Sequence, residues 1–266
     1  MGIAPNDFAH AIRHGGRNAH PTIMTTRERA DRLLVARGLF ESRARAQAAI
    51  AAGRVTADGI LVRKASEEIA PGAVVAAAPE HPYVSRGGIK LAAALDHFAL
   101  PIAGRVCLDV GASTGGFTEV MLRRGARLVY AVDVGRAQLH SRLRDRDDVV
   151  SIEQTDIRKL DPARLTPRPD FAAIDVSFIS LKRVLPAVSQ LLAPRAAMLA
   201  LIKPQFEIGR RGAKKGVVRD QAVQQTVCDE TAAFVAANGW RLRGIVASPI
   251  RGGAGNREFF IAAERD

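Results

Sequence analysis

The sequence predicts an α/β protein in which a large domain with a parallel sheet follows a small α+β module. A glycine-rich loop at residues 111–116 separates a short apolar run, Val106–Val110, from a helical pattern at Phe117–Arg124. Short apolar runs and helical patterns then alternate toward the C-terminus. Such runs are typical of buried parallel strands, and their alternation with helices is typical of a doubly wound sheet.

Length, hydrophobic content and net charge limit the number of domains and the classes of binding partner that fit this chain. The chain has 266 residues, enough for one large or two modest domains, and 47% of them are hydrophobic, enough to form a core. The formal net charge of +12 favours polyanionic partners, nucleic acid first and anionic membranes second. A basic surface that serves only solubility is the alternative.

Cysteine usage and hydropathy predict a cytoplasmic protein. Cys107 lies in the first apolar run and Cys228 in a helical pattern, so both are expected in the core under reducing conditions. No apolar run approaches the roughly 18 residues of a membrane span, and no secretory signal is recognisable. No metal is expected, because no residues have metal-ligand spacing. Residues 1–24 lack periodicity and are expected to form a disordered tail.

The first module is predicted to span residues 25–75. Thr25 to Glu28 resembles a capping box that opens a helix ending at Gly38, and a second helix is expected from about Ser42 to Ala52. Two strands around Asp58-Gly59 and a short strand at Val74-Val75 complete it.

This module is basic, with nine Lys/Arg and four acidic residues between positions 27 and 64. Arginine dominates, and its guanidinium matches phosphate bidentately, although a solvated amphipathic surface is an open alternative. Residues 29–38, 42–50 and 53–55 resemble the S-four RNA-binding domain. The resemblance implies RNA contacts from Arg27, Arg29, Arg32, Arg43 and Arg45.

Residues 76–82 are predicted to be a linker, because prolines interrupt any periodicity there. A helix capped by Ser85 is then expected to continue to about Phe98. Lys90 lies in its early turns, where the helix dipole disfavours a cation, so it is either a surface residue or a lysine retained for function.

Ionisable residues recur at the ends of the predicted strands. Strands are expected at 106–110, 128–133, 149–153, 171–178 and 197–202, a terminal hairpin at 242–247 and 258–262, and helices at 137–144, 181–192 and 222–237. Ligands bind at the carboxyl ends of strands in an open α/β sheet. The residues at or near those ends are Asp109, Asp133, Asp156, Asp175 and Lys203. Asp156 either contacts an adenine or caps the turn that follows.

The glycine loop favours S-adenosylmethionine over other nucleotide cofactors. It lacks the Gly-x-Gly-x-x-Gly pattern of dinucleotide sites and the Gly-Lys-Ser/Thr ending of a phosphate-binding loop, and Asp133 is placed to accept hydrogen bonds from a ribose. An ordinary strand–helix turn is the alternative. The candidate cofactor-binding residues are Asp109, Gly111, Ala112, Ser113, Thr114, Gly115, Gly116, Phe117, Asp133, Asp156 and Asp175.

The glycine-punctuated basic loop at residues 209–216 is interpreted as an RNA-contacting lid, with a disordered surface loop as the alternative. The candidate RNA contacts of this second domain are Arg86, Arg210, Arg211, Lys214 and Lys215.

Residues 83–266 resemble the FtsJ-type ribose 2'-O-methyltransferases, whose signature is a Lys-Asp-Lys-Glu tetrad. Residues 85–91, 109–118, 175–180 and 203–207 closely match the TlyA family, which joins an S-four module to this domain and methylates cytidines of ribosomal RNA. The resemblance implies a Rossmann-like, S-adenosylmethionine-dependent methyltransferase domain after a small α+β RNA-binding domain. It implies that the catalytic residues are Lys90, Asp175, Lys203 and Glu258, the last placed by its order in the chain.

Ribose methylation accounts for the tetrad chemically. A 2'-hydroxyl is a poor nucleophile until a base accepts its proton, and Lys203 is the candidate base. Lys90, a second ammonium nearby, is expected to favour neutral Lys203, while the acids orient the lysines and the hydroxyl. Methylation of base amino groups usually uses an Asn/Asp-Pro-Pro-aromatic segment, where this chain has Asp175-Val-Ser-Phe, and carbon-5 methylation needs a cysteine.

Two other classes of function remain as alternatives: a non-catalytic RNA-binding assembly factor, and a membrane-active haemolysin, since some relatives of the family carry that label. The ribosomal subunit, the nucleotide and the oligomeric state are not determined by these patterns.

Overall fold

The computed structural model describes residues 27–208, 216–252 and 255–266. The chain divides into two compact units, residues 1–80 and 81–266. The predicted tail, residues 1–24, lies outside the described residues. The boundary between the units falls inside the predicted linker.

The N-terminal unit is a small α+β body with one apolar core. Its elements are β1 (Glu28–Arg29), α1 (Ala30–Ala36), α2 (Arg43–Ala51), β2 (Val55–Ala57), β3 (Ile60–Leu61), β4 (Glu68–Ile69) and β5 (Val75–Ala77). β1 pairs with β4, and the second sheet has the order β3-β2-β5. Leu33 and Leu34 of α1 and Ile50 of α2 are buried together with Val55. The two helices therefore bury their apolar faces against each other and the sheet.

Three details of this unit differ from what the sequence predicts. Glu28 lies in β1, so it closes no capping box; α1 begins after Arg29 without a side-chain cap, and Thr25 lies outside the described residues. The last strand begins at Val75 rather than Val74 and continues to Ala77, so the first two residues of the predicted linker belong to the sheet. Backbone pairing with β4, which no local pattern indicates, decides the conformation of Glu28.

Asp31 is the buried charge of the N-terminal unit. Its side chain is 0% exposed, and its carboxylate accepts hydrogen bonds from Arg29, Arg43 and Gln47. The hydrogen bond from Arg29, followed by those from Arg43 and Gln47, outweighs burial and holds the pKa of Asp31 well below its usual range. Because Arg43 and Gln47 lie on α2, Asp31 joins the two helices electrostatically.

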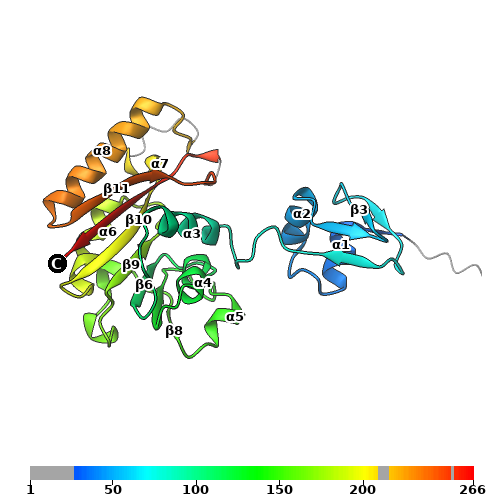
Figure 1. Cartoon of the computed structure of the whole chain (residues 1–266), viewed down its shortest axis with the longest axis horizontal. Helices are drawn as coiled ribbons and strands as arrows, with labels where there is room; N and C mark the ends of the chain where they lie inside the picture. Colours follow the sequence, from blue (N-terminus) through cyan, green and yellow to red (C-terminus); the bar gives the residue numbers. More distant parts are fainter. Residues whose placement is uncertain (1–26, 209–215, 253–254) are drawn as a thin grey trace, which may run out of the picture. The chain divides into compact units, whose positions relative to one another are not determined.

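The C-terminal unit is a seven-stranded mixed sheet between two layers of helices (Figure 1). The strand order is β11-β12-β10-β9-β6-β7-β8, in which β12 runs antiparallel to both of its neighbours and the other pairs are parallel. The strands are β6 (Val106–Val110), β7 (Leu128–Val132), β8 (Val149–Ile152), β9 (Phe171–Ile174), β10 (Ala196–Ile202), β11 (Arg241–Ala247) and β12 (Phe259–Arg265). The doubly wound prediction and its terminal hairpin are confirmed.

The helices of this unit are α3 (Gly87–His97), α4 (Gly116–Arg123), α5 (Ser141–Arg144), α6 (Leu181–Leu191), α7 (Pro204–Glu207) and α8 (Gln221–Ala237), with short 3-10 turns η1 (Ile157–Lys159) and η2 (Pro162–Arg164). One face of the sheet buries Leu91 of α3 and Met121 of α4. The opposite face buries Val188 of α6 and Val227 of α8, and α8 lies beside β11 (Figure 1). Alternation along each strand divides the core between the two faces.

The order of the central strands fixes where a ligand can bind. In the sheet, β6 lies between β7 and β9. After β6 the chain continues toward β7 and after β9 it continues toward β10, so a crevice lies between the ends of β6 and β9. This is the switch point at which ligands bind in such sheets, at the carboxyl ends of the strands. The loops after β6 and β9 carry residues 111–116 and Asp175.

Two helix predictions in this unit are wrong in detail. The expected helix at 137–144 is reduced to α5, because Glu153 accepts the backbone N–H groups of Gln138 and Leu139 instead. Ser85 does not cap α3, which begins at Gly87 without a side-chain cap. A carboxylate distant in sequence replaces the local helical hydrogen bonds in the first case.

We expect Asp31→Ala to destabilise the N-terminal unit by about 2 kcal/mol, because it removes the hydrogen bonds that Arg29, Arg43 and Gln47 donate to the buried carboxylate. Hydrogen exchange of α1 and α2 in the full chain measures this effect, and Arg32→Ala, exposed on the same helix, is the control. The lowered pKa means that the stabilisation is present above the ordinary carboxyl range and is lost as pH falls below it. Equal protection in both variants would contradict the assignment.

Candidate active site

The glycine loop after β6 touches the loop after β9. Gly111 has φ of +85°, and a Cβ there would lie 2.3 Å from the carbonyl oxygen of Asp175. Gly115 has φ of +93° and precedes α4, while a Cβ on Gly116 would meet the Ser85 hydroxyl at 2.1 Å. Side chains at these positions would displace the backbone or fill the crevice, so the glycines keep it open.

Asp133, directly after β7, organises the same loop. Its carboxylate accepts the backbone N–H of Ser113 at 2.8 Å and that of Gly135 at 2.7 Å. Both hydrogen bonds are made to the protein's own backbone, and each carboxylate oxygen keeps a second lone pair for a ligand. The half-buried Asp133 therefore lies where the sequence predicted, beside the glycine loop, and also holds that loop in shape.

Asp109 is the buried acid of β6. It is 0% exposed, Oδ2 accepts a hydrogen bond from the Thr118 hydroxyl at 2.6 Å, and Oδ1 has no hydrogen-bond partner within the described part of the chain. Burial raises the pKa of Asp109 to about 7, and the Thr118 hydrogen bond opposes that rise only in part. This strand therefore ends in a carboxyl that is protonated well above the usual range.

Lys90 and Glu258 form an ion pair across 168 residues of sequence. Lys90 Nζ lies 2.5 Å from Glu258 Oε2, and the two residues are 9% and 3% exposed. Lys90 comes from α3, and Glu258 immediately precedes β12. A Cβ on Gly252 would lie 1.8 Å from Glu258 Oε1, so there is no room for a side chain where the loop before β12 passes this carboxylate. Lys90 is thus a paired, buried lysine and not the surface residue that its position on the helix also allowed.

Lys203 and Asp175 form the second pair. Lys203 directly follows β10 and is 9% exposed; its Nζ lies 2.5 Å from Asp175 Oδ1 and donates to the Ser177 hydroxyl at 2.9 Å. Glu207, in α7, accepts hydrogen bonds from the Ser180 hydroxyl and the Leu181 N–H at the start of α6. This clamp ties the segment after Lys203 to the segment after Asp175.

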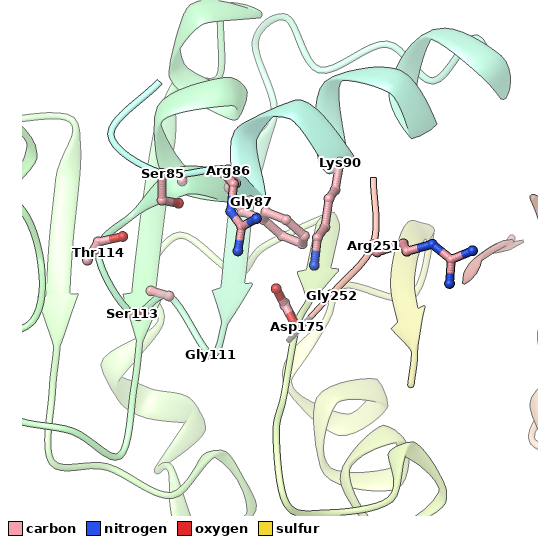
Figure 2. A pocket seen from close by; sticks show the side chains of 13 residues that line it. Ser85, Arg86, Gly87, Lys90, Gly111, Ser113, Thr114, Asp175, Arg251 and Gly252 are labelled. Atoms are coloured by element: carbon pink, nitrogen blue, oxygen red, sulfur yellow. The ribbon is translucent and has the colours of Figure 1, made fainter. Parts of the chain in front are cut away.

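A pocket is lined by one member of each pair, Lys90 and Asp175, but by neither Glu258 nor Lys203 (Figure 2). Figure 2 shows Lys90 extending from α3 toward Asp175, with Arg86 and the Ser113–Thr114 loop at the rim. Four lining residues were not among the sequence candidates: Ser85, Gly87, Arg251 and Gly252. The glycine pair at 87–88 and the run Arg251-Gly-Gly were visible signals, but only the fold brings them to the pocket.

The predicted cofactor residues separate into two groups. Gly111, Ala112, Ser113, Thr114, Gly116, Phe117 and Asp175 line the pocket. Four predicted residues do not line it: Asp109, Gly115, Asp133 and Asp156. The Asp156 carboxylate caps η1 through the Arg158 N–H and pairs with the Arg158 guanidinium at 2.5 Å. Arg158 lowers the pKa of Asp156 to about 2. The capping alternative for Asp156 is therefore the one observed.

The predicted RNA-contacting arginines have different surroundings. Arg29 and Arg43 hold Asp31, and Arg27 donates to the Glu68 carbonyl oxygen, so part of their hydrogen-bonding capacity is used within the unit. Arg32 is exposed and Arg45 is half-buried. Arg86 lines the pocket. The remaining candidates, Arg210, Arg211, Lys214 and Lys215, lie outside the described residues.

Both parts of the chain match known families. Residues 83–265 match the family described as FtsJ-like methyltransferase, and residues 28–75 match the family described as S4 domain. These matches confirm the two resemblances that the sequence motifs indicated.

Individual relatives cover nearly the whole chain. It is 43% identical over 241 residues to the 16S/23S rRNA (cytidine-2'-O)-methyltransferase TlyA of Mycobacterium tuberculosis, covering 90% of each chain. It is 35% identical to hemolysin A of Brachyspira hyodysenteriae, covering 87% of this chain and 97% of that protein. A solved structure from Streptococcus thermophilus, which carries the name hemolysin, superposes with a TM-score of 0.71 at 44% identity, covering 91% of this chain and 89% of that one.

We expect Asp109→Asn to flatten the pH dependence of stability. The folded state retains a proton on Asp109 up to about pH 7, whereas the unfolded carboxyl loses it near 4, so the wild-type chain loses stability as pH rises between these values. The slope is at most about 1.4 kcal/mol per pH unit. Thermal unfolding across this range tests it, with the exposed Asp147→Asn as control. A constant wild-type-to-variant difference would refute the burial effect.

Proposed function

This chain belongs to the FtsJ-like methyltransferase family and carries an S4 domain, and from that premise we propose that it methylates ribose 2'-hydroxyl groups of ribosomal RNA. One observation carries the proposal: two lysine–carboxylate pairs, Lys90–Glu258 and Lys203–Asp175, flank the crevice beside the glycine loop. The four residues of the tetrad come from separate segments of the chain: Lys90 and Asp175 line the pocket, and Glu258 and Lys203 are paired with them.

S-adenosylmethionine is the methyl donor. The glycine loop offers bare backbone, and Asp133 offers carboxylate lone pairs beside it for ribose hydroxyls. Asp109 is fully buried in β6 and does not line the pocket, so we assign it support of the strand through the Thr118 hydroxyl. Asp156 stays a proposed contact to adenine, through the carboxylate lone pairs that its pairing with Arg158 leaves free. When bound, the donor supplies an activated methyl group on its sulfonium sulfur.

Lys203 is the proposed general base. A 2'-hydroxyl becomes a competent nucleophile when its proton is accepted in the transition state. Asp175 and Ser177 hold Lys203 Nζ from two directions, which fixes where the nitrogen can receive that proton once it is neutral. Glu258 similarly fixes Lys90, whose charge stabilises negative charge that develops on the ribose oxygen. The protein's contribution is therefore placement and proton acceptance.

The substrate class rests on the S4 domain, the net charge of +12 and the relatives. Proteins named TlyA are described as acting on cytidine in 16S and 23S rRNA in one organism and in 23S rRNA in another. We extend cytidine as the target to this chain, and a ribosomal RNA substrate implies a cytoplasmic enzyme. Within residues 27–208, 216–252 and 255–266 no helix has the length and apolarity that crossing a bilayer requires.

The two alternatives receive less support. A non-catalytic assembly factor would not need one buried and one partly buried ion pair beside an open pocket, since burying charge is costly. Proteins named hemolysin are 35% and 44% identical to this chain and the methyltransferase TlyA is 43% identical, so sequence identity does not separate the two names. Neither the pocket nor the ion pairs supplies a membrane-disrupting element.

We expect Asp133→Ala to weaken binding of S-adenosylmethionine by about 1–3 kcal/mol, the value of charge-assisted hydrogen bonds to a ribose. Isothermal titration measures the change. Asp133→Asn keeps acceptor capacity for one of the two backbone contacts and should weaken binding less, which separates missing ribose hydrogen bonds from a disordered loop. Unchanged cofactor affinity in both folded variants would show that the cofactor binds elsewhere.

We expect Lys203→Ala to reduce methyl transfer by at least about a thousandfold while cofactor affinity stays within about twofold, because the base acts on RNA and not on the cofactor. Lys203→Arg should not restore transfer, since a guanidinium stays protonated and cannot accept the proton. Lys182→Ala, which removes a half-buried lysine paired with Glu230, is the matched control. Activity in Lys203→Arg would leave the lysine as a positioning group only.

We expect deletion of residues 1–80 to leave cofactor binding intact and to impair methylation of ribosomal RNA. The remaining unit keeps residues 81–82, because Arg123 donates to the Pro82 carbonyl oxygen. Methyl incorporation into ribosomes from cells lacking the protein, measured across salt concentrations, should show a shallower salt dependence than the full chain, because fewer phosphates are bound. Equal activity and equal salt slope would remove the proposed role of the N-terminal unit.

A further inference from the structure

A second pocket of the C-terminal unit shares a wall with the first. Three arginines line it, Arg219, Arg251 and Arg257, together with Gln221, Gln224 and Gly255; we call it the arginine pocket. Arg251 lines both pockets. Figure 2 shows the Arg251 guanidinium directed away from Lys90 and Asp175, outward from the first pocket. The two pockets are therefore neighbours joined at the segment that carries Arg251.

Buried amides hold the walls of the arginine pocket. Asn256 is 3% exposed; its Oδ1 accepts the Val218 N–H and its Nδ2 donates to the Gly216 carbonyl oxygen, both at 3.0 Å. Buried Gln224 donates to the Val218 carbonyl oxygen at 2.8 Å. These bonds join the segment before α8 to the loop before β12 and fix Arg219 relative to Arg257. The pocket is thus part of a bonded framework.

The charge in this pocket is uncompensated within the described part of the chain. No acid lines it, and none of its three arginines forms an ion pair with a described residue. Asp220, next to Arg219, uses its carboxylate to cap α8 through the Ala222 N–H. One Arg251 nitrogen donates to the Gly255 carbonyl oxygen, and the Arg257 guanidinium lies 5.9 Å from the Phe259 ring centre. Most of the guanidinium donors stay available.

The arginine pocket is also linked to the candidate catalytic pairs. Exposed Arg257, which lines the arginine pocket, directly precedes buried Glu258, which forms the ion pair with Lys90. A ribose beside Lys203 and Lys90 carries phosphates on its 3'- and 5'-oxygens. The RNA strand that enters the first pocket must therefore continue past its rim, where the arginine pocket begins.

We propose that the arginine pocket binds a backbone phosphodiester of the RNA substrate next to the methylated ribose. Guanidinium groups match phosphate oxygens bidentately, and three of them around one open pocket would hold an anion of that geometry. The contact positions RNA without reading its sequence. This inference rests on the proposed function and adds to it a docking point within the methyltransferase unit.

The test uses the full chain with ribosomes from cells that lack it. Arg219→Gln and Arg257→Gln, alone and together, are compared with Arg195→Gln, which removes an exposed arginine just before β10, at the end of that strand opposite to the start of β12. The double variant should raise KM for RNA by about tenfold or more, with kcat and cofactor affinity within about twofold. The slope of log KM against log salt should fall by about 0.7–0.9 for each phosphate that the variant no longer binds. Arg195→Gln should match the wild type.

Separate outcomes overturn the two ideas. A wild-type chain that transfers no methyl group to ribose ends the proposed function and this inference with it. If the wild type is active but the double variant keeps its KM and salt slope, the arginine pocket does not bind the backbone while the proposed function stands. A fall in kcat at constant KM also contradicts it. Titration with inorganic phosphate at fixed ionic strength completes the test: saturable binding that disappears in the variants, with KM for RNA unchanged, would make this a small-anion site and contradict the RNA assignment.

Discussion

Two lysine–carboxylate pairs, one buried and one partly buried, impose the main constraint on the methyltransferase unit. Removing an ammonium and a carboxylate from water costs several kcal/mol each, and only close pairing and hydrogen bonding offset it. Lys90–Glu258 joins α3 to the start of β12, and Lys203–Asp175 joins the ends of β10 and β9. The mixed sheet is arranged so that these four residues converge, and Gly252 is bare because a side chain there would strike Glu258.

The cofactor loop and the candidate catalytic residues form one continuous unit. Gly111 lies against the Asp175 carbonyl oxygen, so a change in the loop after β6 is transmitted directly to the residue that holds Lys203. Asp133 closes the loop from the other side through the Ser113 N–H. Glu207 then fixes the segment after Lys203 to the start of α6. The loop proposed to bind the donor and the lysine proposed as base are thus both in direct contact with Asp175, which suits a reaction that depends on alignment more than on activation.

The N-terminal unit shows that arginines with the same sequence signal have different uses. Arg29 and Arg43 use donors on buried Asp31, which joins α1 to α2, whereas Arg32 is exposed on the same helix as Asp31. A guanidinium with five donors can bind one carboxylate and still present N–H groups to a phosphate. The positive charge counted from sequence therefore overstates the number of free arginines but does not remove them as RNA contacts.

Local patterns determined most of the architecture of this protein. Apolar runs five to seven residues long became β6, β7 and β10, and the Asp58-Gly59 turn joined β2 to β3. Asp109 near the end of β6 and the acids after β7 and β9 were placed at one end of the sheet, because parallel strands share it. Those features depend on neighbours in sequence, so the sequence by itself carried them. Only the tertiary structure decided which lysine pairs with which acid, that Asp156 turns to Arg158, that Glu153 replaces the first turns of a helix, and that Arg251 and Gly252 reach the pocket. The physical reason is common to all four: a charged or polar group takes the partner that the fold brings within hydrogen-bond distance, and that partner can lie anywhere in the chain.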